Sequence, residues 1–256
     1  MLFDTHAHYD DEKFDPDRDE LLASMLSHGV GHIINIGCDI ETSKFSIALS
    51  EKYPFIYAAV GFHPSEAHKM KDSDLDTIFK MAQHEKVVAI GEIGLEYHYT
   101  KETAPIQKKR FFEQIELAAA LNLPFQVHDR EATGDCMAIL KSAKMCDRRG
   151  MMHCYSGSKE TARELLNLGM KISVGGTLTF KNNLKTPEVV SYVPIEDIMI
   201  ETDSPYLSPQ KYRGKRNSSL HIHAVAEKIA EIKGMDYDEV VAITEKNAME
   251  FFSIPR

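Results

Sequence analysis

Two histidines near the start of the chain, His6 and His8, are the first residues whose type and spacing could bind a metal ion. They end a short apolar segment and stand two positions apart. In an extended strand, alternate side chains point to the same face, so the two imidazoles would lie about 6–7 Å apart along the strand. His-x-His pairs also occur at protein surfaces without a metal. The pair therefore predicts a metal site only if further ligands come to lie beside it.

Four more residues of ligand type share one feature with this pair, because each lies at the end of an apolar run. The whole set is His6, His8, Glu92, His128, His153 and Asp203. Any one of them alone could be a surface histidine, a helix-capping acid or the start of a turn. Six such placements on five predicted strands favour a shared site, because the carboxyl ends of the strands carry the active site in (β/α)8 enzymes.

Four imidazoles and two carboxylates are too many donors for one tetrahedral zinc ion with an open position. They suit two divalent ions about 3.5–4 Å apart, with one carboxylate bridging, and Glu92 is the predicted bridge. Histidine and carboxylate donors suit Zn, Mn, Fe or Co, and Mg is acceptable through the carboxylates, so the metal is left open. The predicted assignment gives one ion His6, His8 and Asp203, and the other ion His128 and His153.

Short apolar runs alternate with longer amphipathic segments along the chain, which is the pattern of βα units around a parallel sheet. After a first run that ends in His6 and His8, strands are expected at residues 31–37, 56–60, 87–92, 124–128, 150–153, 170–174 and 198–203. Helices are expected at residues 17–28 and 106–121. A third is expected to end before Gly234, and a last one to begin at a capping box formed by Asp236 and Glu239. Eight strand candidates, most followed by a helix candidate, predict a closed (β/α)8 TIM barrel. Such a barrel brings the first strand beside the eighth, and so His6 and His8 beside Asp203.

Composition limits the class of protein. The chain has 256 residues, of which 43% are hydrophobic, and no linker or repeat divides residues 1–256, so a single domain is expected. No segment approaches the roughly 20 apolar residues of a membrane span, and the start lacks a signal-peptide pattern, so no membrane partner is expected. The four cysteines, Cys38, Cys136, Cys146 and Cys154, have no CxxC spacing, which predicts reduced thiols in a cytoplasmic protein. A net charge of −9 argues against broad electrostatic capture of nucleic acid, although metal ions could still hold such a substrate locally.

Several motifs in the same order resemble the TatD family of metal-dependent deoxyribonucleases, among the amidohydrolase-like barrels. The motifs are Asp4-Thr5-His6-Ala7-His8, Gly61-Phe62-His63-Pro64, Gly91-Glu92-Ile93-Gly94-Leu95, Val127-His128-Asp129-Arg130-Glu131, His153-Cys154-Tyr155-Ser156-Gly157 and Glu201-Thr202-Asp203-Ser204-Pro205-Tyr206-Leu207. The resemblance spans nearly the whole chain and implies a (β/α)8 fold, divalent metal dependence and hydrolysis of phosphodiester bonds in DNA. It gives metal-ligand roles to the same six residues. Exonuclease action and a monomer are favoured, strand polarity is left open, and no organic cofactor is expected.

The sequence departs from the family pattern at two places. Glu96 stands where the family usually has Asp, and the extra methylene is expected to be tolerated because the residue should not bind the metal. Asn217-Ser218-Ser219 stands where Asn-Glu-Pro is usual. That loop is expected to touch substrate, so this change bears on substrate preference.

Glu92 and Asp203 are the predicted catalytic residues. Asp203 could bind an ion and accept a proton from the attacking water, so it is the predicted general base. Glu201, two residues earlier on the expected strand, would face the same way. It could orient a ligand histidine or form a salt bridge inside the barrel, and the sequence leaves both open.

Three residues are predicted to contact substrate: His63, Arg130 and Arg213. His63 ends the third strand and could donate to a phosphate or a leaving oxygen, or could be an ordinary turn histidine. Arg130 could reach a phosphate or pair with Glu131. Arg213 belongs to the basic loop 211–216, which could form a phosphate track with an aromatic residue for base stacking, or could simply be solvated.

Two other functions compete with the nuclease. An amidohydrolase-like enzyme could use the same barrel on a small cyclic amide or ester, but such enzymes often carry a carboxylated lysine as the metal bridge. Here Glu92 stands at the strand end, and Lys86 lies before the strand. A non-catalytic metal-binding protein is the second alternative, and the complete ligand set argues against it.

Overall fold

The eight strands of the computed structural model, which describes residues 1–143 and 148–255, lie in one sheet whose order follows the chain from β1 to β8. Their register pairs are parallel. The predicted (β/α)8 barrel is therefore confirmed. The strands are β1 (Leu2–Ala7), β2 (Val30–Ile36), β3 (Ile56–Val60), β4 (Val87–Glu96), β5 (Phe125–Arg130), β6 (Gly150–Met152), β7 (Lys171–Val174) and β8 (Ile198–Ile200).

Helices follow most of the strands, as the βα pattern predicts. The α-helices are α1 (Arg18–Ala23), α2 (Ile40–Lys52), α3 (Asp72–Met81), α4 (Ala104–Leu121), α5 (Thr133–Ser142), α6 (Lys159–Asn167), α7 (Lys185–Tyr192), α8 (His223–Lys233) and α9 (Tyr237–Phe252). Short 3-10 helices are η1 (Glu12–Phe14), η2 (Leu26–His28), η3 (Pro64–Glu66), η4 (Lys101–Thr103), η6 (Gly176–Thr179), η7 (Ile195–Asp197), η8 (Gln210–Tyr212) and η9 (Ser219–His221).

The chain divides into two compact units, which are described in turn. The first unit contains Met1–Asn35, Cys154–Leu166 and the chain from Lys171 onward. The second unit contains Ile36–His153 and Asn167–Met170. That the whole chain forms a single domain stays a prediction.

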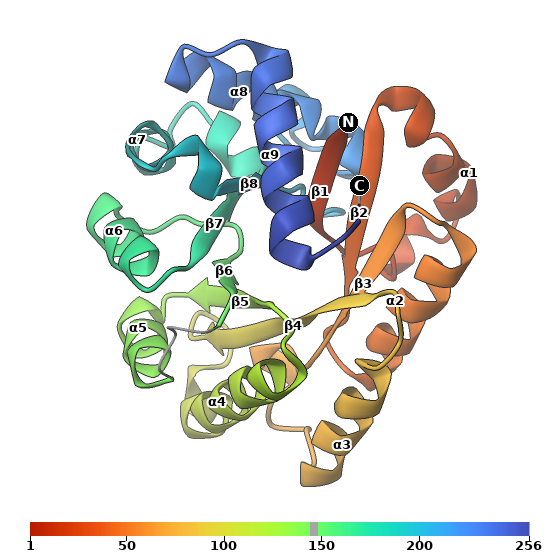
Figure 1. Cartoon of the computed structure of the whole chain (residues 1–256), viewed down its shortest axis with the longest axis vertical. Helices are drawn as coiled ribbons and strands as arrows, with labels where there is room; N and C mark the ends of the chain where they lie inside the picture. Colours follow the sequence, from red (N-terminus) through yellow and green to blue (C-terminus); the bar gives the residue numbers. More distant parts are fainter. Residues whose placement is uncertain (144–147, 256) are drawn as a thin grey trace. The chain divides into compact units, whose positions relative to one another are not determined.

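In the first unit, β1 lies beside β8 and the segment that follows it. A parallel bridge pairs Ala7 with Ser204, and the backbone N–H of Asp203 donates to the His6 carbonyl at 2.9 Å. Helix α9 covers both strands, and Figure 1 shows it beside β1. Its buried Phe252 stacks on Phe3 of β1, with ring centroids 6.0 Å apart. The predicted neighbourhood of the first and eighth strands is therefore confirmed.

In the second unit, β3, β4, β5 and β6 pair in chain order, and α4 packs against β4. The apolar residues at i, i+4 and i+7 on α4, Phe111, Ile115 and Ala118, are all buried, as their spacing predicts. Pro105 lies in the first turn of α4, where its missing N–H costs no hydrogen bond. The helix ends at Asn122, whose φ of 53° is left-handed.

Strand β4 runs four residues beyond the predicted end at Glu92, and all ten of its residues are buried. Gly94 makes this extension possible. It pairs with His128 on β5, has a φ of +143°, and would place a Cβ 2.1 Å from the His128 carbonyl oxygen. Only glycine allows the two strands to approach this closely, and the close approach carries Glu96 to the end of the strand beside His128.

Three sequence predictions of local structure need correction. The segment 17–28 forms two short helices, α1 and η2, which end at the left-handed Gly29. Strand β8 ends at Ile200, so Asp203 lies beyond the strand with a φ of 54°. The Asp236 side chain caps α9 through the Asp238 N–H, so the capping box with Glu239 was wrong, because the carboxylate accepts from the nearer N–H.

Candidate metal centre

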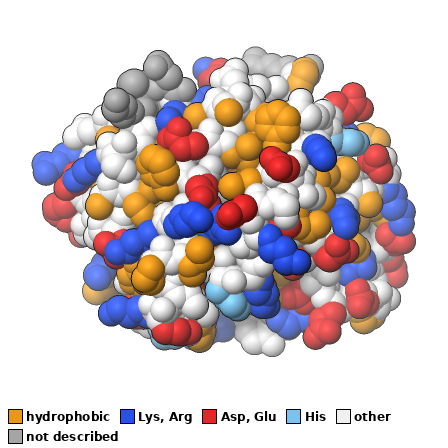
Figure 2. Space-filling view, turned by 90° about the horizontal axis from the view of Figure 1, so that it is seen from below, with side chains coloured by type: hydrophobic (Ala, Val, Ile, Leu, Met, Phe, Trp, Pro, Cys, Tyr) orange, Lys and Arg blue, Asp and Glu red, His pale blue; other side chains and the backbone are white. Residues whose placement is uncertain are grey.

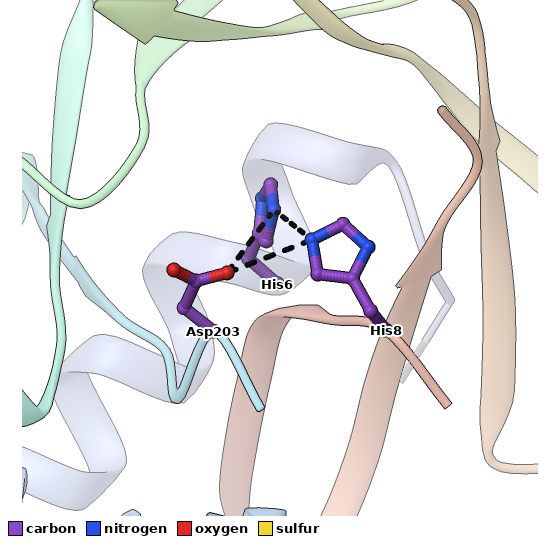
Figure 3. Close-up of side chains that lie close together, drawn as sticks. All are labelled: His6, His8 and Asp203. Carbon is purple, nitrogen blue, oxygen red and sulfur yellow. Dashed lines mark hydrogen bonds and ion pairs between the residues drawn. The ribbon is translucent and has the colours of Figure 1, made fainter. Parts of the chain in front are cut away.

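Three predicted ligands meet in the first unit, and we call them the first cluster: His6, His8 and Asp203 (Figure 3). His6 Nε2 lies 3.1 Å from His8 Nε2. Asp203 Oδ1 lies 3.9 Å from His6 Nε2 and 3.5 Å from His8 Nε2. His6 is fully buried, and the Asp203 side chain is 16% exposed. The cluster therefore has one donor closed off from solvent and one within reach of a substrate.

The spacing of these three donor atoms fits a divalent ion. Donors around a tetrahedral zinc ion, with bonds of about 2.0–2.1 Å, lie about 3.3 Å from one another. The three separations in the first cluster, 3.1, 3.5 and 3.9 Å, lie around this value. Two imidazoles and one carboxylate leave further coordination positions for other ligands, as catalytic metal sites require.

A buried network centred on Asp4 holds the two segments of the first cluster together. Asp4 Oδ1 accepts the Thr202 N–H at 2.9 Å, and Oδ2 accepts the Thr202 and Ser219 hydroxyls at 2.6 Å each. Asp4 also accepts the His6 N–H at 3.3 Å. Burial raises the pKa of Asp4 to about 7, although the hydrogen bonds from Ser219 and Thr202 lower it. One carboxylate thus fixes the backbone next to both His6 and Asp203, a role that the strand-end pattern does not indicate.

The second unit gathers the other predicted ligands, and we call them the second cluster: Glu92, His128 and His153. Glu92 Oε1 lies 2.7 Å from His128 Nδ1 and 3.0 Å from His153 Nε2. The rings of His128 and His153 are stacked, with centroids 5.8 Å apart. A carboxylate oxygen and two ring nitrogens therefore converge here as well.

Glu96 holds the far side of the His128 ring. Its Oε2 lies 3.2 Å from His128 Nε2, while Oε1 accepts the backbone N–H groups of His98 and Tyr99 at 2.7 and 3.0 Å. Burial lowers the pKa of His128, but its hydrogen bonds to Glu92 and Glu96 outweigh this and raise the pKa above its usual value. Burial alone would raise the pKa of Glu96. Hydrogen bonds from His128 and the backbone outweigh burial, so the pKa of Glu96 lies below its usual value.

This contact supports the tautomer that His128 would need in order to bind a metal ion through Nδ1. When Nε2–H donates to Glu96, Nδ1 keeps a lone pair on the side of Glu92, where a metal ion would bind. The sequence predicts that Glu96 does not bind the metal directly, and this stays a prediction. It does not indicate that Glu96 contacts His128, a predicted ligand. A second carboxylate in the strand, four residues after Glu92 and two residues after Gly94, was the available signal.

His63 lies beside the second cluster, with Nε2 3.7 Å from Glu92 Oε1. Its Nδ1 accepts the backbone N–H of Ser65 at 3.2 Å, so the neutral ring carries its proton on Nε2. A protonated ring nitrogen cannot bind a metal but can donate a hydrogen bond. The geometry therefore suits His63 to the predicted donor role better than to that of a ligand.

Glu201 has contacts that neither predicted role included. It accepts the Cys154 N–H at 2.6 Å and the Ser173 hydroxyl. The argument that Glu201 and Asp203 share one face of a strand does not hold, because the strand ends at Ile200. Glu201 thus connects the segment that follows β6 to strand β7 within the first unit.

The predicted substrate-contacting arginines lie in different surroundings. Arg130 is exposed, with its guanidinium carbon 5.3 Å from the centre of the Tyr99 ring. Glu131, its alternative partner, instead lies 2.8 Å from His98 Nδ1. Arg213 is exposed above the Phe180 ring at 4.8 Å.

Arg216 differs from the rest of the basic loop. Its two terminal nitrogens each lie 2.7 Å from an oxygen of Asp17, and one also donates to the Lys13 carbonyl. A bidentate pair of this kind occupies the guanidinium. The phosphate track predicted for the loop therefore reduces to Lys211, Arg213 and Lys215.

The segment Asn217-Ser218-Ser219 is buried, so the expectation that it touches substrate was wrong. Asn217 Nδ2 donates to the carbonyls of Thr202 and Tyr206 at 2.8 and 2.7 Å. Ser219 joins Asp4 to the Tyr9 hydroxyl. The departure from the family pattern therefore bears on how the segment carrying Asp203 is supported.

A family model described as TatD related DNase matches residues 3–253. The chain belongs to the TatD family. Among its relatives, a Bacillus subtilis protein named uncharacterized metal-dependent hydrolase YabD is 45% identical over 99% of this chain and 100% of its own. The crystal structure of the TatD homologue YjjV from Escherichia coli K12 superimposes with a TM-score of 0.93 at 30% identity, over 99% of this chain and 98% of that one. The Salmonella typhimurium 3′-5′ ssDNA/RNA exonuclease TatD is 28% identical over 99% of both chains.

Membership of the TatD family makes this chain a metal-dependent hydrolase by family. Residues able to hold a metal ion lie together in both units, as His6, His8 and Asp203 in the first and as Glu92 and His128 with His63 in the second. Within residues 1–143 and 148–255, no helix is long and apolar enough to cross a membrane. No disulfide joins Cys38, Cys136 and Cys154, and Cys146 lies outside the described residues.

Proposed function

We propose that this TatD-family protein hydrolyses phosphodiester bonds in DNA as an exonuclease, with the aid of two divalent ions. The observation that supports this most is the pair of donor clusters, one in each unit. In the first cluster, two ring nitrogens and a carboxylate oxygen lie within 3.9 Å of one another. In the second cluster, two ring nitrogens lie within 3.0 Å of the same oxygen, Glu92 Oε1. In the proposal the first cluster holds one ion and the second cluster holds the other. The bridging role of Glu92 stays a prediction of the sequence.

Phosphodiesters resist hydrolysis because a weak nucleophile must attack a shielded anion. Two divalent ions, when bound, lower the pKa of water and neutralise charge on the phosphoryl oxygens. Asp203 is proposed to accept the proton of the attacking water on its carboxylate, which is the least buried member of the first cluster. His6 lies in β1 and His8 directly follows that strand, so β1 holds both side chains in position.

His63 is proposed to donate its Nε2 proton toward the leaving oxygen or a phosphoryl oxygen. The Ser65 N–H fixes this tautomer, so the donor is in place before substrate arrives. Arg130 and Arg213 are proposed to pair with phosphates farther along the DNA strand, because both side chains are exposed.

DNA is proposed as the substrate because a relative at 28% identity is named a 3′-5′ ssDNA/RNA exonuclease. The net charge of −9 does not favour nucleic-acid capture over the whole surface. Basic and acidic side chains are interspersed on the face drawn in Figure 2, which agrees with that expectation. Binding would therefore depend on the metal ions and on a few exposed cations. Zn, Mn, Mg, Fe and Co all remain eligible.

The test is digestion of end-labelled single- and double-stranded DNA by protein stripped with a chelator and then supplied with each metal in turn. A lactone and a simple carboxylic ester run in parallel. Metal-dependent release of nucleotides from one end supports the proposal. Hydrolysis of the lactone or ester without cleavage of DNA would instead assign the amidohydrolase-like alternative, and activity on none of them would favour a non-catalytic protein.

A further inference from the structure

Tyr206, three residues after Asp203, is fixed in place although its side chain faces solvent. Its N–H donates to the Asp203 carbonyl at 2.9 Å, and its carbonyl accepts Asn217 Nδ2 at 2.7 Å. Its hydroxyl donates to Asp11 Oδ2 at 2.5 Å. The residue is nevertheless 45% exposed. Three hydrogen bonds thus hold an aromatic ring at the surface of the first unit.

The ring lies next to the first cluster and next to a cation. Its centroid is 6.5 Å from that of His8, with the planes inclined at 62°. Lys13 Nζ lies 4.3 Å from the ring centroid, and Lys13 is itself exposed. A ligand held at His6, His8 and Asp203 would therefore meet an aromatic surface and a positive charge beside it.

The hydroxyl of Tyr206 is unsuited to further chemistry. A tyrosine phenol keeps its proton at neutral pH. That proton is already donated to Asp11. What the residue offers to a ligand is its ring.

We propose that Tyr206 is the stacking platform for the nucleobase next to the phosphate that is cleaved, with Lys13 pairing with a neighbouring phosphate. The inference rests on the proposed nuclease function. A nucleotide matches this surface because it combines an anion, which the metal ions and Lys13 attract, with a flat aromatic base. Stacking of this kind accepts every base, so the platform gives affinity for nucleic acid without sequence preference.

The test compares single-stranded oligonucleotides that differ only at the nucleotide being removed, which carries its base or is abasic. The wild-type protein first establishes which end is cleaved. Wild type should prefer the intact end in kcat/KM by about 5- to 150-fold, which corresponds to the usual worth of about 1–3 kcal/mol for one stacked base. Tyr206→Leu should bring this ratio close to one. Tyr206→Phe keeps the ring and should retain most of the preference.

Tyr192→Leu is the matched control, because Tyr192 is 44% exposed and ends α7, ahead of β8 in the chain. It should leave the ratio unchanged. A variant that only folded poorly or lost metal would lower both rates together, so the ratio isolates stacking. If wild type cleaves DNA and Tyr206→Leu keeps the full preference, the platform is wrong while the nuclease stands. If wild type cleaves neither oligonucleotide, the proposed function fails and the platform with it.

Discussion

Replacing Glu96 by glutamine should weaken metal binding by the second cluster, although Glu96 is not one of the predicted ligands. Glu96 Oε1 accepts two backbone N–H groups, so the glutamine oxygen must take that position. The glutamine NH2 group then faces His128 Nε2, which lies 3.2 Å from the wild-type carboxylate. An NH2 group only donates, so Nε2 must accept and the ring proton moves to Nδ1. Nδ1 is the atom 2.7 Å from Glu92, and once protonated it has no lone pair for a metal.

The expected loss is about 10- to 100-fold in metal affinity, the usual effect of removing the hydrogen-bond partner of a ligand histidine. Glu96 is only 3% exposed, so water cannot easily replace it. The assay is competition for Zn²⁺ or Mn²⁺ between the protein and a coloured chelator, with stability followed by urea denaturation. Affinity should fall while the cooperative unfolding transition remains.

Glu131→Gln is the matched control. Glu131 also pairs with a histidine, His98, at 2.8 Å, but its side chain is 65% exposed. Metal affinity should be unchanged in this variant. Wild-type metal affinity in a folded Glu96→Gln protein would refute the tautomer argument. Glu96 would then be only a tolerated replacement for the family's usual Asp, as the sequence predicts.

Three further predictions concern the first unit. Asp203→Ala should abolish nuclease turnover while the protein stays folded, and wild-type rates with unchanged metal content would remove its catalytic role. Ser219→Ala should lower the free energy of unfolding by about 1–3 kcal/mol in urea denaturation, because it leaves Asp4 short of a buried hydrogen bond; an unchanged midpoint would count against the network. The double change Arg213→Gln and Lys215→Gln should reduce the slope of log affinity against log salt for single-stranded DNA by about 1.4, which is about 0.7 for each lost phosphate contact. A slope equal to that of wild type would exclude this loop from phosphate binding.

The positions of the predicted ligands could be read from the sequence because each lies at the end of an apolar run, even where the strand itself ends later, as β4 does, or earlier, as β8 does. Apolar runs mark the strands, and in a barrel of parallel strands the residue after each run lies at the same face. His6 and His8 lie beside Asp203 in the first unit for this reason. Glu92, His128 and His153 meet in the second unit for the same reason. Their roles as ligands remain predictions.

The contacts around the ligands could not be predicted, because they depend on where the backbone departs from regular structure. The apolar run ends near Glu92, yet the strand continues to Glu96, because Gly94 allows a close approach to the neighbouring strand. The tautomer of His63 depends on one backbone N–H, that of Ser65. No pattern of residue types records either contact.

The departure at residues 217–219 shows the same limit. A polar segment after the last strand suggests a substrate loop, since loops at this end of a barrel carry function. Instead, Ser219 turns inward to Asp4, and Asn217 supports the turn after Asp203. Polar residues here satisfy buried groups from distant parts of the chain, which only the tertiary structure reveals.

Titration of the stripped protein with Mn²⁺ or Zn²⁺, while cleavage of end-labelled single-stranded DNA is followed, tests the central claim most directly. The account predicts no cleavage without metal, and a rate that rises with added metal and saturates near two ions per chain. Cleavage at the full rate in excess chelator would contradict it, as would saturation with metal and no cleavage of DNA.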